Sequence, residues 1–172
     1  MGFLSLLLIA VGLSMDAFAV SVAKGLAVPE VRPRHALLAG VWFGGFQALM
    51  PVVGYLLASS FSAIVVSIDH WIAFALLLFI GLNMIREAVW GDEESGDEDF
   101  GPRKMFLMAV ATSIDALAVG VSMAFIGVDI VAAALSIGVV TFLFSFAGIY
   151  LGRSVGSKLG KKAGILGGIV LI

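Results

Sequence analysis

The stretch LSMDAFAVS, residues 13–21, places the carboxylate of Asp16 in the middle of an otherwise apolar run that covers residues 3–23. A helix of about 20 apolar residues is long enough to cross the ~30 Å hydrocarbon core of a bilayer. A charged group at that depth costs at least about 2.5–3.5 kcal/mol on insertion scales, so acids inside membranes usually have a function. The stretch therefore predicts a transmembrane helix that carries a functional acid.

The composition of the whole chain is that of a membrane protein. Of its 172 residues, 61% are hydrophobic and 13% are charged, with a mean hydropathy of +1.14. A soluble domain is about 25% charged. We therefore expect the chain to lie in a lipid bilayer and to bind no nucleic acid. Further apolar runs of about spanning length cover residues 36–58, 71–89, 105–125 and 130–151.

A last apolar run, residues 163–172, begins like a span but covers only about half a bilayer at ~1.5 Å per residue. We expect an all-α, polytopic transmembrane bundle of six helices, with a sixth helix that is truncated here and continues past Ile172 in the natural protein. The chain has no cysteine, which excludes disulfides and thiolate metal sites.

The basic residues predict the orientation of this bundle. If the spans alternate across the membrane, all ten Lys and Arg residues fall on one side, in or beside the loops after the first, third and fifth spans. The positive-inside rule then places these three loops in the cytoplasm and the N-terminus outside.

The acid-bearing motif occurs twice. Residues 14–22, SMDAFAVSV, match residues 113–121, SIDALAVGV, at six of nine positions, and Asp16 aligns with Asp115. Three spans fall in each half, so the two copies enter the membrane from opposite sides. This is the pattern of a 3+3 inverted repeat.

The repeat also predicts the domain organisation. Gly44 and Gly54 of the second span align with Gly138 and Gly148 of the fifth. We expect three segments: a first three-helix repeat over residues 1–90, an acidic cytoplasmic linker over residues 91–104, and a second three-helix repeat, with its last helix incomplete, over residues 105–172.

Both repeated acids fall near the middle of the membrane. Asp16 lies eight residues from Lys24, about 12 Å, and Asp115 lies eleven residues from Lys104, about 16 Å along a helix. Inverted-repeat transporters bind substrate and coupling ions at the repeat interface. Two facing carboxylates with neutral oxygens around them suit Mg²⁺, Ca²⁺ or Mn²⁺, so we expect a metal site around Asp16 and Asp115. The structural alternative, two protonated acids bonded to helix backbones, stays open.

Few other polar side chains lie at a useful depth to complete this site. The candidates are Gln47, Asn83, Ser14, Ser113 and Met50. Ser14 and Ser113 are close to the acids in the chain, but hydroxyls in helices often bond their own backbone instead. A thioether at Met50 would favour Mn²⁺ over Mg²⁺, although methionine in an apolar helix commonly serves only packing.

Charged residues lie at the end of the third span. Arg86 and Glu87 form either a gate at the cytoplasmic mouth or an ordinary solvated helix end. The stretch GDEESGDEDF, residues 91–100, holds six acids but lacks the spacing of a calcium loop, so we expect a solvated linker. His35 and His70 lie at span ends, where we expect packing rather than metal binding.

Together these motifs resemble those of the bacterial manganese efflux pump (MntP) family. The resemblance covers essentially the whole chain and rests on LSMDAFAVS (13–21), FGGFQALMP (43–51), ATSIDALAVGVS (111–122) and LGG (166–168). It implies six helices, paired intramembrane acids at Asp16 and Asp115, a polar position at Gln47, Mn²⁺ as the transported substrate and a place in the bacterial inner membrane. The residues alone imply only a hard divalent cation.

An exporter of this kind needs an energy source. Moving two positive charges outward against ~100 mV costs about 4.6 kcal/mol. The stretch GSKLGKK, residues 156–162, lacks the spacing and the final Ser or Thr of a phosphate-binding loop. We therefore expect proton antiport without a cofactor, because two adjacent carboxylates that hold no cation favour the uptake of protons.

Three other functions are considered. One is export of another hard divalent cation, or of a small organic cation or amino acid, on a similar six-helix plan. Another is an intramembrane aspartyl protease, but such enzymes are expected to carry a Gly-x-Gly-Asp motif and residues 112–115 read TSID; we therefore expect no enzyme. A purely structural membrane protein would not explain the duplicated acids. The sequence leaves the oligomeric state open.

Overall fold

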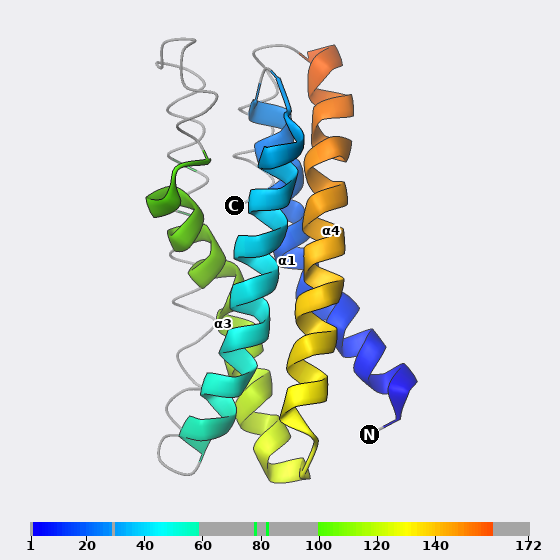
Figure 1. The fold of residues 1–172 in the computed structure, drawn as a ribbon, viewed down its shortest axis with the longest axis vertical. Coiled ribbons are helices and arrows are strands. Elements are labelled where there is room, and N and C mark those ends of the chain that lie inside the picture. Colours follow the sequence, from blue (N-terminus) through cyan, green and yellow to red (C-terminus); the bar gives the residue numbers. More distant parts are fainter. Residues whose placement is uncertain (1, 29, 59–77, 79–81, 83–99, 160–172) are drawn as a thin grey trace.

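The computed structural model of the chain describes residues 2–28, 30–58, 78, 82 and 100–159. Within these residues, four long helices form one bundle along the long axis of the molecule (Figure 1). They are α1 (Phe3–Ala27), the helix over Pro33–Ala58, α3 (Pro102–Ile126) and α4 (Ile130–Leu159). The helix over Pro33–Ala58, drawn in cyan in front of α1, is called the 33–58 helix below.

Each of the four helices is long and apolar enough to cross a membrane. The described part of the chain is therefore an all-helical, multi-pass membrane bundle. The expected spans over residues 71–89 and 163–172 lie outside the described residues. The six-helix count and the truncated last helix stay predictions.

Local chemistry explains where α3 ends and α4 begins. Gly127 ends α3 with a φ of 68°, in the left-handed region that favours glycine. The Oδ1 atom of Asp129 accepts hydrogen bonds from the N–H groups of Val131 (3.0 Å) and Ala132 (3.3 Å), and so caps the start of α4. Only a short turn separates the two helices, so α3 and α4 run in opposite directions.

Apolar side chains cover the outer faces of the bundle. On α4, Val131, Leu135, Val139 and Leu143 recur every fourth residue, and each is 59–62% exposed. An apolar stripe of this extent on the surface of a soluble protein would mark a binding site. In a chain whose described helices are each long and apolar enough to cross a membrane, it matches the acyl chains of lipids.

Glycines set the closest approaches between α1 and α4. A Cβ atom built on Gly148 would lie 3.1 Å from the carbonyl oxygen of Phe18, and Gly152 lies against the carbonyl oxygen of Val22. Small residues allow this approach of helix backbones in membranes. Because Phe18 pairs with Gly148 and Val22 with Gly152, α1 and α4 run parallel.

The 33–58 helix crosses α4 at another pair of glycines. A Cβ atom on Gly44 would lie 2.8 Å from the carbonyl oxygen of Gly138, and one on Gly138 would lie 3.0 Å from that of Gly44. The contact is therefore reciprocal. It makes the 33–58 helix and α4 the central pair of the described bundle.

The 33–58 helix packs against α3 on its other side. Gly54 lies against the carbonyl oxygen of Leu117, and Gly120 lies against that of Pro51. The close contacts thus connect α1 to α4, α4 to the 33–58 helix, and the 33–58 helix to α3.

Candidate cation site

Two apolar clusters fill the bundle, and polar residues separate them. The first cluster includes Ala17, Phe43, Ala111 and Ile149. The second includes Leu13, Ala116 and Ile137, with Met50 packed against it. On each of the four described helices, a group of polar residues comes between the segments that enter the two clusters. We call them the polar layer: Ser14, Asp16, Gln47, Thr112, Ser113, Asp115, Thr141 and Ser145.

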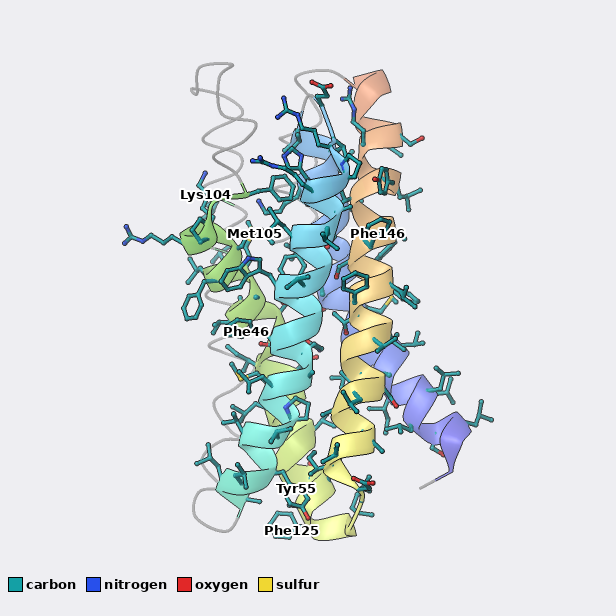
Figure 2. The ribbon with its side chains drawn as sticks, viewed as in Figure 1. Phe46, Tyr55, Lys104, Met105, Phe125 and Phe146 are labelled. Atoms are coloured by element: carbon teal, nitrogen blue, oxygen red, sulfur yellow. The ribbon has the colours of Figure 1, made fainter. Side chains whose placement is uncertain are left out.

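Aromatic and sulfur-containing side chains surround the first cluster. Phe46 and Met105 lie between the 33–58 helix and α3 (Figure 2), and the Phe46 ring meets that of Phe106 edge-on with centroids 5.5 Å apart. The polar layer is therefore bordered by well-packed apolar side chains on the side of Lys104.

Gln47 is fully buried and links two helices in this layer. Its Nε2 atom donates a 2.8 Å hydrogen bond to the carbonyl oxygen of Leu13 on α1. The bond orients the amide, because the amino group must face Leu13. The Oε1 atom of Gln47 is buried and has no hydrogen-bond partner among the described residues. An amide oxygen held in this way is available to a ligand.

The serines beside the two acids bond their own helices. Ser14 Oγ donates to the carbonyl oxygen of Val11 at 2.8 Å, and Ser113 Oγ donates to that of Ala109 at 2.6 Å. Both serines therefore make the bond to their own backbone that hydroxyls in helices often make. Donation leaves the oxygen lone pairs free, so their role as metal ligands stays a prediction.

The two carboxylates occupy equivalent places on their helices. Asp16 lies two residues before Phe18, which faces α4, and Asp115 lies two residues before Leu117, which faces the 33–58 helix. At about 100° per residue, each acid points away from the central helix pair. Asp115 is partly buried, and its Oδ1 accepts a 2.8 Å hydrogen bond from the N–H of Ala116. Asp16 is exposed.

One expectation is that the acids face one another inside the bundle. Asp16 is exposed, on the side of α1 that turns away from α4, and its pairing with Asp115 stays a prediction. Depth along the helix could be estimated from the sequence, whereas the direction of the side chain depended on which face of α1 packs.

Of the other expected site residues, the structure describes Met50 but not Asn83, Arg86 or Glu87. Met50 is partly buried against the second apolar cluster, which is the packing role named as its alternative. Asn83, Arg86 and Glu87 lie outside the described residues. Within the part of the chain that the structure describes, no three His, Cys, Asp or Glu side chains gather where a metal ion could be held. A cation site there would combine carboxylates with neutral oxygens.

A buried cation near the end of α1 was not expected. Lys24 is fully buried, and its Nζ lies 4.6 Å from the centroid of the Phe100 ring. The His35 ring stacks on the same ring with centroids 4.4 Å apart, in agreement with the packing role expected for His35. Cation–π attraction helps to explain how a lysine can be accommodated here. The position of Lys24 in the sequence, eight residues after Asp16, did not predict that its side chain is buried.

Sequence reasoning also missed Thr141 and Ser145 of α4. Both are fully buried, and neither Oγ atom has a hydrogen-bond partner among the described residues. The repeat contained the signal: the spacing that relates Gly44 to Gly138 also relates Gln47 to Thr141.

Comparisons with known proteins agree with these features. A family model described as "Putative manganese efflux pump" matches residues 30–172. A relative from Acetivibrio thermocellus is 52% identical over 173 residues, covering 100% of this chain and 87% of the relative. One from Desulfitobacterium hafniense is 52% identical over 172 residues, covering 100% of this chain and 91% of the relative.

A third relative, from Bifidobacterium adolescentis, is 53% identical over 171 residues, covering 98% of this chain and 91% of the relative. All three carry the name "Putative manganese efflux pump MntP". No solved structure matches the chain at a significant level. Because the family model matches most of the chain and the relatives are about half identical to it, the chain belongs to the manganese efflux pump (MntP) family.

Proposed function

We propose that this protein is a secondary transporter that exports Mn²⁺ from the cytoplasm across the bacterial inner membrane by proton antiport. Its membership of a family named for manganese efflux supports the substrate. The single observation that carries the mechanism is the pair of acids, Asp16 and Asp115, at equivalent places in one polar layer.

The contacts between glycines support an inverted repeat. Gly54 meets the carbonyl oxygen of Leu117, and the residues that the repeat aligns with them, Gly148 and Phe18, meet in the same way. The contact that relates the central pair is reciprocal, as expected at a pseudo-two-fold axis. The two halves would rock about this axis, so that the polar layer opens alternately to each side.

The distribution of charge supports the proposed orientation. Lys104 lies in the upper part of the molecule, and Tyr55 and Phe125 lie at its lower end (Figure 2). With the end that carries Lys104 in the cytoplasm, the N-terminus is outside. Mn²⁺ would then enter the polar layer from the end of the molecule where Lys104 lies.

The chemistry of the polar layer suits a hard divalent cation. Two carboxylates would compensate the charge of Mn²⁺, and the oriented Oε1 of Gln47, in the same polar layer, would supply a neutral oxygen. Asn83, Ser14, Ser113 and Met50 are the further candidate ligands. When Mn²⁺ leaves, the carboxylates would take up protons on the outer side, and the return of these protons to the cytoplasm would drive export.

Transport into inside-out membrane vesicles tests this proposal. The vesicles expose the cytoplasmic side, so an acid interior should drive uptake of Mn²⁺, and each ion taken up should release protons. Excess Mg²⁺ and Ca²⁺ should compete weakly. Uptake that ignores the pH gradient would contradict the antiport, and stronger competition by Mg²⁺ or Ca²⁺ would contradict Mn²⁺ as the substrate.

A further inference from the structure

Thr141 and Ser145 differ from six other helix hydroxyls of the described chain. Six hydroxyl side chains donate to a carbonyl oxygen three or four residues earlier: Ser14, Ser21, Thr112, Ser113, Ser122 and Ser136. Thr141 and Ser145 are fully buried, yet among the described residues their Oγ atoms bond nothing. A buried hydroxyl without a partner destabilises a fold. Thr141 and Ser145 thus lack the bond to their own helix backbone that the six other hydroxyls make, and another partner would offset this cost.

These hydroxyls lie on the face of α4 that points into the bundle. Gly138, three residues before Thr141, faces the 33–58 helix, and Gly148, three residues after Ser145, faces α1. All four positions fall on one stripe of a helix with 3.6 residues per turn. The hydroxyls are thus directed to the place where the 33–58 helix and α1 meet α4.

Gln47 approaches the crossing from its other side, on the 33–58 helix. Gln47 and Thr141 lie three residues beyond the crossing at Gly44 and Gly138, on two antiparallel helices. Each Cα–Cβ bond tilts toward the N-terminus of its own helix, which is back toward the crossing. The side chains therefore lean toward one another, and the amide of Gln47 is held by its bond to Leu13.

The three groups that have no partner among the described residues complement one another through a single kind of ligand. Thr141 and Ser145 offer O–H donors, whereas Gln47 Oε1 can only accept. A metal cation would satisfy the lone pairs and leave both O–H donors unpaired. A water molecule accepts two hydrogen bonds and donates to the amide oxygen, and buried waters make about three such bonds.

We propose that Gln47, Thr141 and Ser145 form a buried hydration site at the crossing, in which one or two water molecules bridge the two repeats. Its kinetic role rests on the proposed function. Direct side-chain bonds or dry packing would lock the crossing, whereas bonds to water can be exchanged while the helices shift. Thr141 and Ser145 are positioning residues of the pivot and not ligands of the transported cation, whereas Gln47 Oε1 has a second lone pair that stays available to the cation.

The full-length protein carrying Thr141→Val, Ser145→Ala, or both tests the proposal. Thr141→Ser is the rescue variant, and Ser136→Ala, whose hydroxyl bonds Ala132 at 2.8 Å on the same helix, is the control. Two quantities are measured: the melting temperature in detergent, and the KM and kcat for Mn²⁺ in proteoliposomes. The melting temperature needs no assumption about the substrate.

Water bridges that stabilise the crossing predict a lower melting temperature for the double variant, by about 3 °C or more. They also predict a kcat reduced about fivefold with an unchanged KM, since the loss would lie in the conformational step. Thr141→Ser and Ser136→Ala should behave like wild type.

A higher melting temperature in the double variant would mean that the hydroxyls are dry and unpaired, which would overturn the hydration site. A raised KM would make them cation ligands and would overturn the positioning role. If the wild-type protein moves no Mn²⁺, the proposed function fails on that result alone, whereas the sign of the temperature shift still decides whether the site holds water.

Discussion

Gly44 and Gly138 contact each other reciprocally: a Cβ atom on either residue would lie within 3.0 Å of the carbonyl oxygen of the other. Real Cβ atoms essentially never approach backbone more closely than this, so a side chain at either position would push the helices apart. The crossing of the 33–58 helix and α4 therefore depends on two residues that the internal repeat places opposite each other. It is the point about which the two proposed halves would turn.

Replacing Gly44 by alanine should weaken this crossing. The added methyl group meets backbone that cannot yield cheaply, and overpacking of this kind costs about 1–3 kcal/mol. Gly45 is the matched control, because a Cβ atom there meets nothing within 4 Å. Gly45→Ala should stabilise the helix by up to about 1 kcal/mol. Thermal unfolding in detergent measures both changes, and equal melting temperatures for the two variants would argue against a tight crossing.

The cysteine-free chain allows the orientation of α1 to be tested directly. Gly2 and Glu30 lie near opposite ends of α1, and both are exposed. In intact cells, a membrane-impermeant maleimide should label Gly2→Cys and should label Glu30→Cys only after permeabilisation. The reverse pattern would place the N-terminus in the cytoplasm and invert the proposed direction of entry.

Phe100 should stabilise the end of the bundle where Lys24 is buried. Phe100→Leu keeps an apolar side chain but removes the ring that contacts Lys24 and His35. The expected loss in the free energy of unfolding is about 1–2 kcal/mol, from the cation–π and stacking contacts. Phe125→Leu is the control, since Phe125 is 70% exposed. If denaturant unfolding shows the same stability for both variants, the Lys24–Phe100 contact contributes nothing.

Much of the helical plan could be predicted from apolar runs. The run over residues 36–58 became the helix Pro33–Ala58, and the run over residues 105–125 became α3, which begins three residues earlier. The expected end at residue 151 fell short, because α4 continues to Leu159 through polar residues such as Arg153. Hydropathy predicts only the apolar part of a helix, which lies in the lipid. Backbone hydrogen bonds continue the helix into the polar region beyond it, so the helix ends later than the apolar run.

The candidate site was predictable in its residue types and less so in its directions. The duplicated motif identified Asp16 and Asp115, but the exposure of Asp16 depends on which face of α1 packs against α4. A single Thr or Ser in an apolar helix carries little information, because the usual partner of its hydroxyl is its own backbone. Thr141 became notable only when its oxygen was found buried and without that bond.

The most direct test of the account is the rate of Mn²⁺ uptake into inside-out vesicles for Asp16→Asn and Asp115→Asn. Both changes keep the shape of the side chain and remove its charge. Asp129→Asn is the matched control, since Asp129 caps α4 and asparagine caps helices equally well. The account predicts that Asp16→Asn and Asp115→Asn each reduce uptake to the background of empty vesicles, with unchanged melting temperatures, while Asp129→Asn transports normally. Normal transport by either Asp16→Asn or Asp115→Asn would contradict a cation site built from the two repeated acids.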